Sequence, residues 1–292
     1  MPSQPDILEV GPRPQGAGFP RWIRRAEVPD VSLPDRAIYE CRRTGPIPID
    51  GDVDAKPWPW ADLVHIRTGD VVSLRSRVAM MWDDDHLYVA FDFVDPDREP
   101  IATAPGTHVY AFDTTAEFFV GGPDGYHEFG VNSTGIGYEL RWYAVDPLVE
   151  RGDTAAIDRL FRIPNFLYFV PQVVEPGKVG DLDYRMPGLS HVERWQERDG
   201  SPGWTLEMAM PWHGIRELTG LGSPRPGDDF VVQAMRVHHE PADRAAARGA
   251  LAGGTGDGRS PTDMWTLSVQ GNANVHNVSR WARVRLSDAS VS

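Results

Sequence analysis

The chain has 292 residues, of which 41% are hydrophobic and 24% charged, so it can bury a substantial core and its composition excludes wholesale disorder. Its formal charge of −13, from 42 acidic and 29 basic residues, argues against a surface that binds nucleic acid or an anionic membrane. No apolar run approaches the roughly 18 residues that a membrane-spanning helix needs. The 29 glycines and 26 prolines favour many strands joined by turns over a helical bundle.

Two further features bear on the compartment. Cys41 is the one cysteine, so the chain forms no internal disulfide and the redox environment stays open. The first residues, MPSQPDILEV, lack a basic segment followed by an apolar segment, so they do not resemble a secretory signal. The sequence therefore predicts a cytoplasmic protein, or an extracellular one if a leader has been removed.

The strand pattern starts after an extended segment. Residues 1–45 are rich in Pro and Arg and lack sustained periodicity, which predicts an N-terminal arm with a short strand near residues 37–41. Short apolar runs with turn signals then recur as far as residue 287, which predicts one all-β domain over 46–287, an antiparallel β-sandwich. The expected strands of that domain cover 78–81, 87–94, 116–120, 126–132, 137–143, 204–210, 230–238, 264–269 and 280–286.

Two stretches interrupt the strand pattern. Residues 146–200 form a long insertion with one expected helix, for which Asp153 is the N-cap and Ile157 lies on the apolar face. Residues 241–262 are rich in Ala, Gly and Arg and are expected to form a mobile loop. The insertion contains several aromatic residues, so it is a candidate roof over a pocket.

Side-chain alternation predicts a polar face on the sheet. Successive side chains of a strand point to opposite faces, so Phe118 and Phe129 turn toward the core and leave their polar neighbours on the other side. Carboxylates, amides, guanidinium groups and phenols together suit the recognition of sugar hydroxyls, although a solvated sheet face has the same pattern. The polar set gathered in this way comprises Glu117, Tyr126, Glu128, Asn132, Arg141 and Tyr143.

Six short motifs recur in a fixed order along the expected sandwich. They are Ile49-Asp50-Gly51 with Trp58, Trp82-Asp83-Asp84-Asp85 with Leu87-Tyr88, Glu117-Phe118-Phe119-Val120, Tyr126 with Glu128-Phe129 and Asn132, Gly203-Trp204-Thr205 with Glu207 and Pro211-Trp212, and His276 with Arg280-Trp281. In this order they resemble the family 9 carbohydrate-binding modules, β-sandwich domains found on bacterial xylanases. The resemblance implies a β-sandwich that binds a saccharide, in the setting of carbohydrate metabolism.

The resemblance also implies particular ligand residues. It places a sugar-binding glutamate at Glu117 and a sugar-binding asparagine at Asn272. Where the family stacks the sugar between two tryptophans, this chain has Ala111 and Val275. His276 lies next to the second of these positions and is therefore included among the expected ligand-binding residues.

Calcium is the one metal that the resemblance implies, in a structural role. Hard cations prefer clustered carboxylate oxygens, and the candidate ligands are Asp83, Asp85 and Asp95. Aspartates in turns also act as solvated caps. No other cofactor is expected.

Two other hypotheses are compatible with the sequence. A repurposed sandwich enzyme would use Glu117 and Glu128 for acid–base chemistry, such as glycoside hydrolysis or conversion of a small metabolite, in a pocket roofed by residues 146–200. An interaction module would instead use its arm and insertion to contact a protein partner or a second copy of the chain. No nucleophile elbow, phosphate-binding loop or dinucleotide fingerprint supports a more specific activity.

Overall fold

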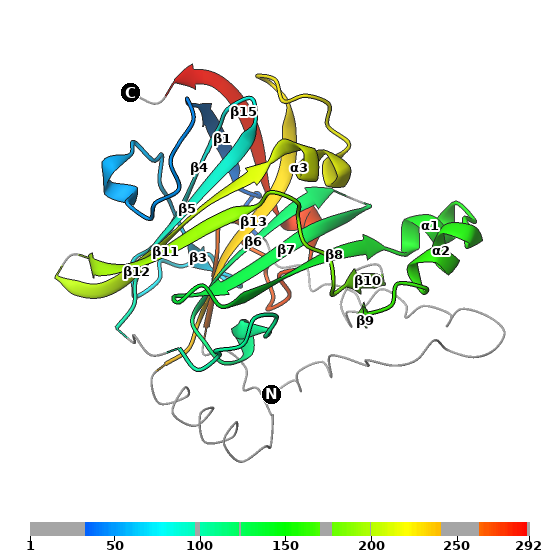
Figure 1. Cartoon of the computed structure of the whole chain (residues 1–292), viewed down its shortest axis with the longest axis horizontal. Coiled ribbons are helices and arrows are strands. Elements are labelled where there is room, and N and C mark those ends of the chain that lie inside the picture. Colours follow the sequence, from blue (N-terminus) through cyan, green and yellow to red (C-terminus); the bar gives the residue numbers. More distant parts are fainter. Residues whose placement is uncertain are drawn as a thin grey trace, which may run out of the picture.

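A computed structural model describes residues 33–96, 100–122, 124–169, 177–198, 200–240 and 263–290 (Figure 1). The expected loop over 241–262 and the first 32 residues of the expected arm lie outside the described residues. The strands are β1 (Ile38–Arg43), β2 (Ala61–Asp62), β3 (Val64–His65), β4 (Ser76–Trp82), β5 (His86–Val94), β6 (Thr115–Gly122), β7 (Gly125–Asn132), β8 (Gly137–Ala144), β9 (Phe166–Phe169), β10 (Lys178–Asp181), β11 (Ser190–Arg198), β12 (Ser201–Pro211), β13 (Asp229–His238), β14 (Asp263–Thr266) and β15 (Ala282–Ser290). The helices are α1 (Asp146–Glu150), α2 (Thr154–Leu160) and α3 (Trp212–Thr219), with 3-10 turns at Val53–Ala55, Val109–Ala111 and Val278–Arg280.

The strands form one continuous sheet that folds over on itself as a sandwich. Its order is β11-β12-β5-β4-β1-β15-β13-β6-β7-β8-β10-β9. We call β11-β12-β5-β4 the first half-sheet and β13-β6-β7-β8-β10-β9 the second half-sheet, with β1 and β15 between them. Side chains from both, such as Phe91, Leu206, Phe118 and Val232, form the main core between the layers. The predicted all-β sandwich is therefore confirmed.

The end of the expected arm belongs to the sheet. The short strand expected near residue 37 forms as β1, which pairs with β15 on one side and β4 on the other. Both pairings are parallel, whereas the other pairings of the sheet are antiparallel. Cys41 of β1 is fully buried in the main core. The structured domain thus includes residues that the sequence pattern assigned to the arm.

The insertion contains more regular structure than expected. Asp153 caps α2 as predicted, because its side chain accepts a hydrogen bond from the Ala156 backbone N–H. Ile157 is buried on the apolar face of α2. A second helix, α1, precedes α2, and β9 and β10 add two strands to the edge of β8. The last insertion strand, β11, pairs along its whole length with β12 and forms the opposite edge of the sheet.

Helix α3 was not expected from the strand pattern. It follows β12 directly, and Ile215 and Leu218 turn into the main core, where α3 packs against β6 and β7. Gly220 ends the helix with a backbone φ of 72°, a conformation that glycine adopts without a side-chain clash. No helix among the described residues is long and apolar enough to span a membrane.

Candidate functional site

Strand register decides which of the predicted site residues share a face. In the second half-sheet, Glu128 pairs with Leu140 and Tyr126 pairs with Trp142. Glu117 and Glu128 therefore share a face with Tyr138, Leu140 and Trp142. Arg141 and Tyr143 point to the other side. The expectation that they join the glutamates is wrong, because alternation fixes the faces within one strand but not the phase between neighbouring strands.

The face that carries Glu117 is buried rather than solvated. We call its apolar residues the outer cluster: Phe119, Tyr126, Tyr138, Leu140, Trp142, Met235, Val237, Val275 and Trp281, with Ile66, Ala102, Val109 and Leu167. Within it Glu117 is only 2% exposed and Glu128 only 5%. Loop residues before β6 and before β15 cover this side of the sheet. The predicted open polar face is thus replaced by a second, partly polar core.

One phenol links the two buried glutamates. The Tyr138 hydroxyl lies 2.8 Å from Glu128 Oε1 and 3.3 Å from Glu117 Oε1. The indole Nε1 of Trp142 donates a hydrogen bond of 2.5 Å to Glu128 Oε2. A phenol has a single proton, so it can donate to only one carboxylate, and the shorter contact favours Glu128.

The surroundings of Glu117 and Glu128 favour one proton on the pair near neutral pH. Burial raises the pKa of Glu117 well above its usual value, and the nearby charge of Glu128 raises it further. Burial also raises the pKa of Glu128 to about 6, while donors from Trp142 and Tyr138 and the charge of Lys178 limit that rise. Glu117 therefore holds the proton, and its carboxylic acid can donate to the Tyr138 oxygen. Glu128 is the charged member near neutral pH.

Lys178 and His276 occupy the same side of the sheet. The buried Lys178 ammonium donates to the His276 backbone carbonyl at 2.8 Å and lies 5.2 Å from the centre of the Tyr126 ring. Burial, together with the charge of Lys178, lowers the pKa of His276 well below its usual value. The neutral His276 ring can therefore accept a hydrogen bond from the Tyr126 hydroxyl at Nδ1, 2.6 Å away. The predicted residues Tyr126 and His276 are thus brought together, but as partners of each other.

Aromatic residues fill the space above the glutamates. The His108 ring stacks on Tyr138, with centroids 4.8 Å apart and an angle of 3° between the rings. The Tyr138 ring also lies over Gly130, where a Cβ atom would approach it to 2.6 Å. Burial lowers the pKa of His108, so a neutral ring caps the cluster. Glu117 is consequently enclosed by protein groups.

Asn132 and Asn272 hold loops. The amide nitrogen of Asn132 donates to the Ala102 carbonyl and to Asp113 Oδ2, which tethers the loop before β6. Its amide oxygen accepts backbone N–H groups of the turn that follows β7. The amide oxygen of Asn272 accepts the Asn274 backbone N–H at 2.7 Å. Both asparagines therefore hold loops in place through their side-chain hydrogen bonds.

The predicted calcium ligands do not converge. Asp83 caps the β4–β5 turn, because its Oδ1 accepts the backbone N–H groups of Asp85 and His86. Asp95 lies at the other end of the nine-residue strand β5, which separates it from that turn by roughly 30 Å at the usual rise per residue. There it accepts from the Trp204 indole and lies 3.8 Å from Arg236. Among the described residues, no group of three His, Cys, Asp or Glu side chains is arranged to hold a metal ion.

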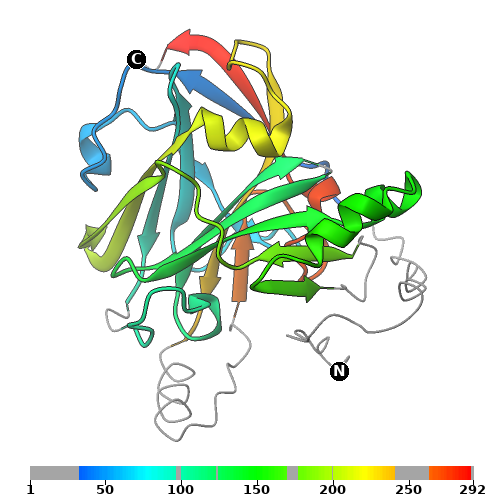
Figure 2. The same ribbon diagram turned by 45° about the vertical axis from the view of Figure 1, so that its right-hand side comes forward.

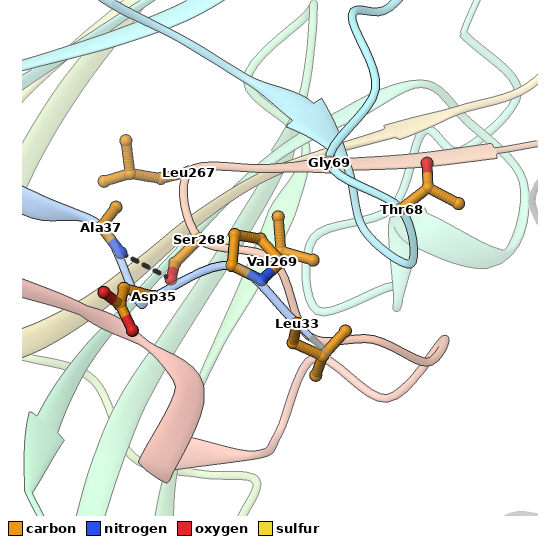
Figure 3. Close-up of a pocket in the computed structure, with 9 residues that line it drawn as sticks. Leu33, Asp35, Ala37, Thr68, Gly69, Leu267, Ser268 and Val269 are labelled. Carbon is orange, nitrogen blue, oxygen red and sulfur yellow. Dashed lines mark hydrogen bonds between the residues drawn. The ribbon is translucent and has the colours of Figure 1, made fainter. Parts of the chain in front are cut away.

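Two hollows of ligand size are present in the described part of the chain. The first has a volume of about 570 Å³ and lies where residues 33–37 cross the Thr68–Gly69 turn and residues 267–269 (Figure 3). Of the described residues that line it, Asp35 is the one that carries a charge. Ser268 is already engaged, because its hydroxyl accepts the Ala37 N–H and donates to the Arg280 carbonyl. This hollow therefore offers few free polar groups.

The second hollow is lined by more charged side chains than the first. We call it the helix-pair pocket, because α1 and α2 form one wall while the end of β8, the turn before β7 and the end of α3 form the others. Figure 2 shows the helix pair extending from the end of β8, with α3 lying above β6 and β7. Its volume is about 340 Å³, within the usual range for small-molecule sites. Its lining residues are Asp124, Gly125, Arg141, Trp142, Tyr143, Ala144, Leu148, Arg151, Ala156, Arg159, Leu160, Glu217 and Leu218.

The polar side chains of this pocket are arranged around Arg141. Its guanidinium donates to Glu217 Oε2 at 3.1 Å and lies over the Tyr143 ring, 4.9 Å from the centroid. Arg151 lies 3.6 Å from Asp124. The Arg159 guanidinium has no hydrogen-bond or ion-pair partner among the described residues. An aromatic ring, planar guanidinium groups and carboxylates thus meet in one concave site.

The sequence pointed to only part of this pocket. Arg141 and Tyr143 were predicted as ligand residues, although on the same face as the glutamates, and α1 and α2 of the insertion form a wall of this pocket instead of the expected roof over Glu117 and Glu128. Glu217 was missed because α3 was missed. Arg151, which follows α1, and Arg159 of α2 carry no sequence signal that distinguishes them from ordinary surface arginines. Within the described part of the chain, α1 and α2 do not roof Glu117 and Glu128, because the helix pair lies on the Arg141 side of β8 while the two glutamates lie on the other.

Comparisons with known proteins place the fold. No family model matches the sequence, and no curated protein matches it. Among solved structures, the chain is similar to a "putative carbohydrate-binding protein" from Bacteroides uniformis, at 13% identity and a TM-score of 0.52, over 87% of this chain and all of that one. It is also similar to a family 9 carbohydrate-binding module from Caldicellulosiruptor kristjanssonii, solved with glucose and with cellotriose. There the identity is 12%, the TM-scores are 0.47 and 0.49, and 87% and 86% of this chain and 97% and 94% of the matched chains are covered. Structures of family 9 modules are thus among those that the chain resembles, as the sequence predicted, and the match to the Bacteroides uniformis protein shows a likeness of fold.

Proposed function

We propose that the protein is a carbohydrate-binding domain and that a small saccharide occupies the helix-pair pocket. The observation that carries the proposal is the meeting of Tyr143, Arg141 and Glu217 in a cavity of about 340 Å³. Sugar hydroxyls are bound by planar groups that form paired hydrogen bonds, and sugar C–H faces pack on aromatic rings. The likeness in fold to a protein described as carbohydrate-binding supports the same class of ligand.

The alternative location, beside Glu117, is less suited to a ligand. Glu117 and Glu128 are already hydrogen-bonded to Tyr138, and Glu128 also accepts a hydrogen bond from Trp142. A sugar there would have to displace the stacked rings of His108 and Tyr138. The helix-pair pocket needs no such displacement.

Calorimetric titration of the full chain with neutral and acidic mono-, di- and oligosaccharides tests the proposal. We expect saturable binding of at least one sugar, which Tyr143→Ala weakens by about tenfold or more through loss of the stacking surface. Arg194→Ala is the matched control, because Arg194 is an exposed arginine of the first half-sheet that lies 3.8 Å from Asp52, outside the pocket. Failure of every sugar to bind would overturn the function.

A second pair of variants separates the two locations. Glu117→Gln keeps the shape of the outer cluster and leaves the helix-pair pocket untouched, so we expect it to retain sugar binding. If Glu117→Gln abolished binding while Tyr143→Ala preserved it, the saccharide would bind on the outer-cluster side, and the proposed site would be wrong. Circular dichroism of each variant checks that its fold is intact.

A further inference from the structure

The charges of the helix-pair pocket allow the ligand class to be narrowed, on the basis of the proposed function. Among the described residues that line the pocket, three are arginines and two are carboxylates, which leaves one excess positive charge there. The chain as a whole has a formal charge of −13. A local excess of guanidinium groups is thus unlike the average surface of this protein and marks a place where an anion is favoured.

The three arginines differ in how far they are committed. Arg141 is held by Glu217 and by the Tyr143 and Tyr184 rings, with only 20% of its side chain exposed. Arg151 and Asp124 are both largely exposed and lie 3.6 Å apart, which is a loose pair. The side chain of Arg159, near the end of α2, has no hydrogen-bond or ion-pair partner among the described residues. One guanidinium is therefore fixed as part of the wall, whereas another is available to a ligand.

We infer that the helix-pair pocket binds a saccharide that carries a carboxylate, such as a uronic acid, with Arg159 as the residue that selects the charge. A carboxylate accepts two parallel hydrogen bonds from a guanidinium, and its single negative charge balances the single excess positive charge of the pocket. A phosphate dianion would leave a surplus negative charge facing Asp124 and Glu217. The sugar ring would lie against Tyr143, whose hydroxyl has a raised pKa owing to burial and therefore remains a hydrogen-bond donor.

The test compares matched sugars that share one ring and differ in the group at C6. Glucuronic acid, its methyl ester, glucose and glucose 6-phosphate are titrated into the full chain at neutral pH by calorimetry, and the same is done for galacturonic acid and galactose. We expect the uronic acids to bind about tenfold more tightly than the ester and the neutral sugars, which is the difference that one charge-assisted contact supplies. A higher affinity for glucose 6-phosphate than for glucuronic acid would overturn the carboxylate assignment.

Arg159→Gln provides the residue-level test. We expect this variant to lose the preference for uronic acids and to keep its affinity for the neutral sugar. The matched control is Arg162→Gln, because Arg162 lies one turn further on, pairs with Asp158 at 3.9 Å and does not line the pocket. An unchanged preference in Arg159→Gln would overturn the role of Arg159.

The two proposals fail in different ways. If neutral sugars bind as tightly as uronic acids and Tyr143→Ala weakens both, the charge selection is wrong while the carbohydrate-binding function stands. If none of the sugars binds, the carbohydrate-binding function is itself wrong, and the ligand class falls with it.

Discussion

Glu207 and Glu117 are both buried, one on each outer face of the sandwich, and the cost of burying the carboxylate is offset differently in each. Glu207 of the first half-sheet is fully buried, and Lys56 Nζ lies 2.7 Å from its carboxylate. The backbone N–H groups of Asp50 and Gly51 also donate to it. Glu117 of the second half-sheet is almost as buried, but its neighbours are Tyr138, Thr115 and another glutamate. The first carboxylate is neutralised by a cation, whereas the second retains its proton.

This difference in protonation distinguishes a glutamate with a structural role, Glu207, from one with an unusual pKa, Glu117. Both glutamates belong to motifs that resemble the family 9 modules, and burial alone does not distinguish them. Glu207 closes the contact between β12 and the Ile49-Asp50-Gly51 segment, so its charge serves to anchor a loop. Lys56 holds an elevated pKa, because its hydrogen bonds to Asp50 and Glu207 outweigh the effect of burial. Glu117 anchors no loop and instead belongs to a buried hydrogen-bonded cluster with Tyr138 and Glu128.

The largest effect is expected from Glu207→Ala. Removing one member of a buried ion pair leaves Lys56 and two backbone N–H groups without their acceptor, which should lower the free energy of unfolding by about 3 kcal/mol or more. Urea denaturation followed by tryptophan fluorescence measures this loss. Glu197→Ala is the control, because Glu197 is an exposed residue of the neighbouring strand β11. A loss no larger than that of the control would show that Glu207 does not anchor the segment.

Removing the phenol that joins the two acids should have the next largest effect. Tyr138→Phe deletes the donor to Glu128 and the hydroxyl beside Glu117, so buried polar atoms lose partners at a cost of about 1 to 3 kcal/mol. The matched control is Tyr184→Phe, because the Tyr184 hydroxyl is buried and has no hydrogen-bond partner among the described residues. Thermal unfolding should rank the first variant below the parent and leave the second equal to it or more stable. The reverse order would contradict the bridging role of Tyr138.

The proton held by Glu117 predicts a particular dependence of stability on pH. The pKa of Glu117 is raised in the folded state by burial and by the charge of Glu128, so the native protein binds more protons than the unfolded chain above pH 4.5. The raised pKa therefore stabilises the folded state fully below pH 4.5. This contribution is lost as the pH rises through the folded-state pKa values of Glu117 and Glu128, and the value for Glu128 is about 6. Glu117→Gln mimics the protonated acid and should therefore gain stability relative to the parent between pH 5 and 8. Parallel urea midpoints for parent and variant across that range would rule out a protonated Glu117.

The smallest effect is expected at the exposed end of the Glu207 network. Asp50 lies 2.6 Å from Lys56, but more than half of its side chain is exposed to solvent. Asp50→Asn keeps an oxygen that can accept the Asp52 backbone N–H and removes only a screened charge. We expect no resolvable shift in the urea midpoint, in contrast to Glu207→Ala. A shift as large as that of Glu207→Ala would place the anchoring charge at Asp50.

Local signals in the sequence were sufficient for individual elements. Apolar alternation located the hairpin of β4 and β5 and the run of β6, β7 and β8, because each strand buries alternate residues whatever its partner is. The Asp153 cap located α2 through a hydrogen bond between neighbouring residues. By contrast, α3 starts with Pro211 as its N-cap and lacks a side-chain cap. It therefore left no comparable local signal.

The candidate site depended on pairings that no local pattern contains. The sequence determined that Glu117, Glu128 and Arg141 sit on strands, and that Leu140 and Trp142 alternate with Arg141. Only the tertiary structure decided that register puts Leu140 opposite Glu128, so that both glutamates are buried and Arg141 lies with α1, α2 and α3. The physical reason is that side-chain alternation is fixed by backbone geometry within one strand. Register, by contrast, is set by the packing of residues far apart in the chain.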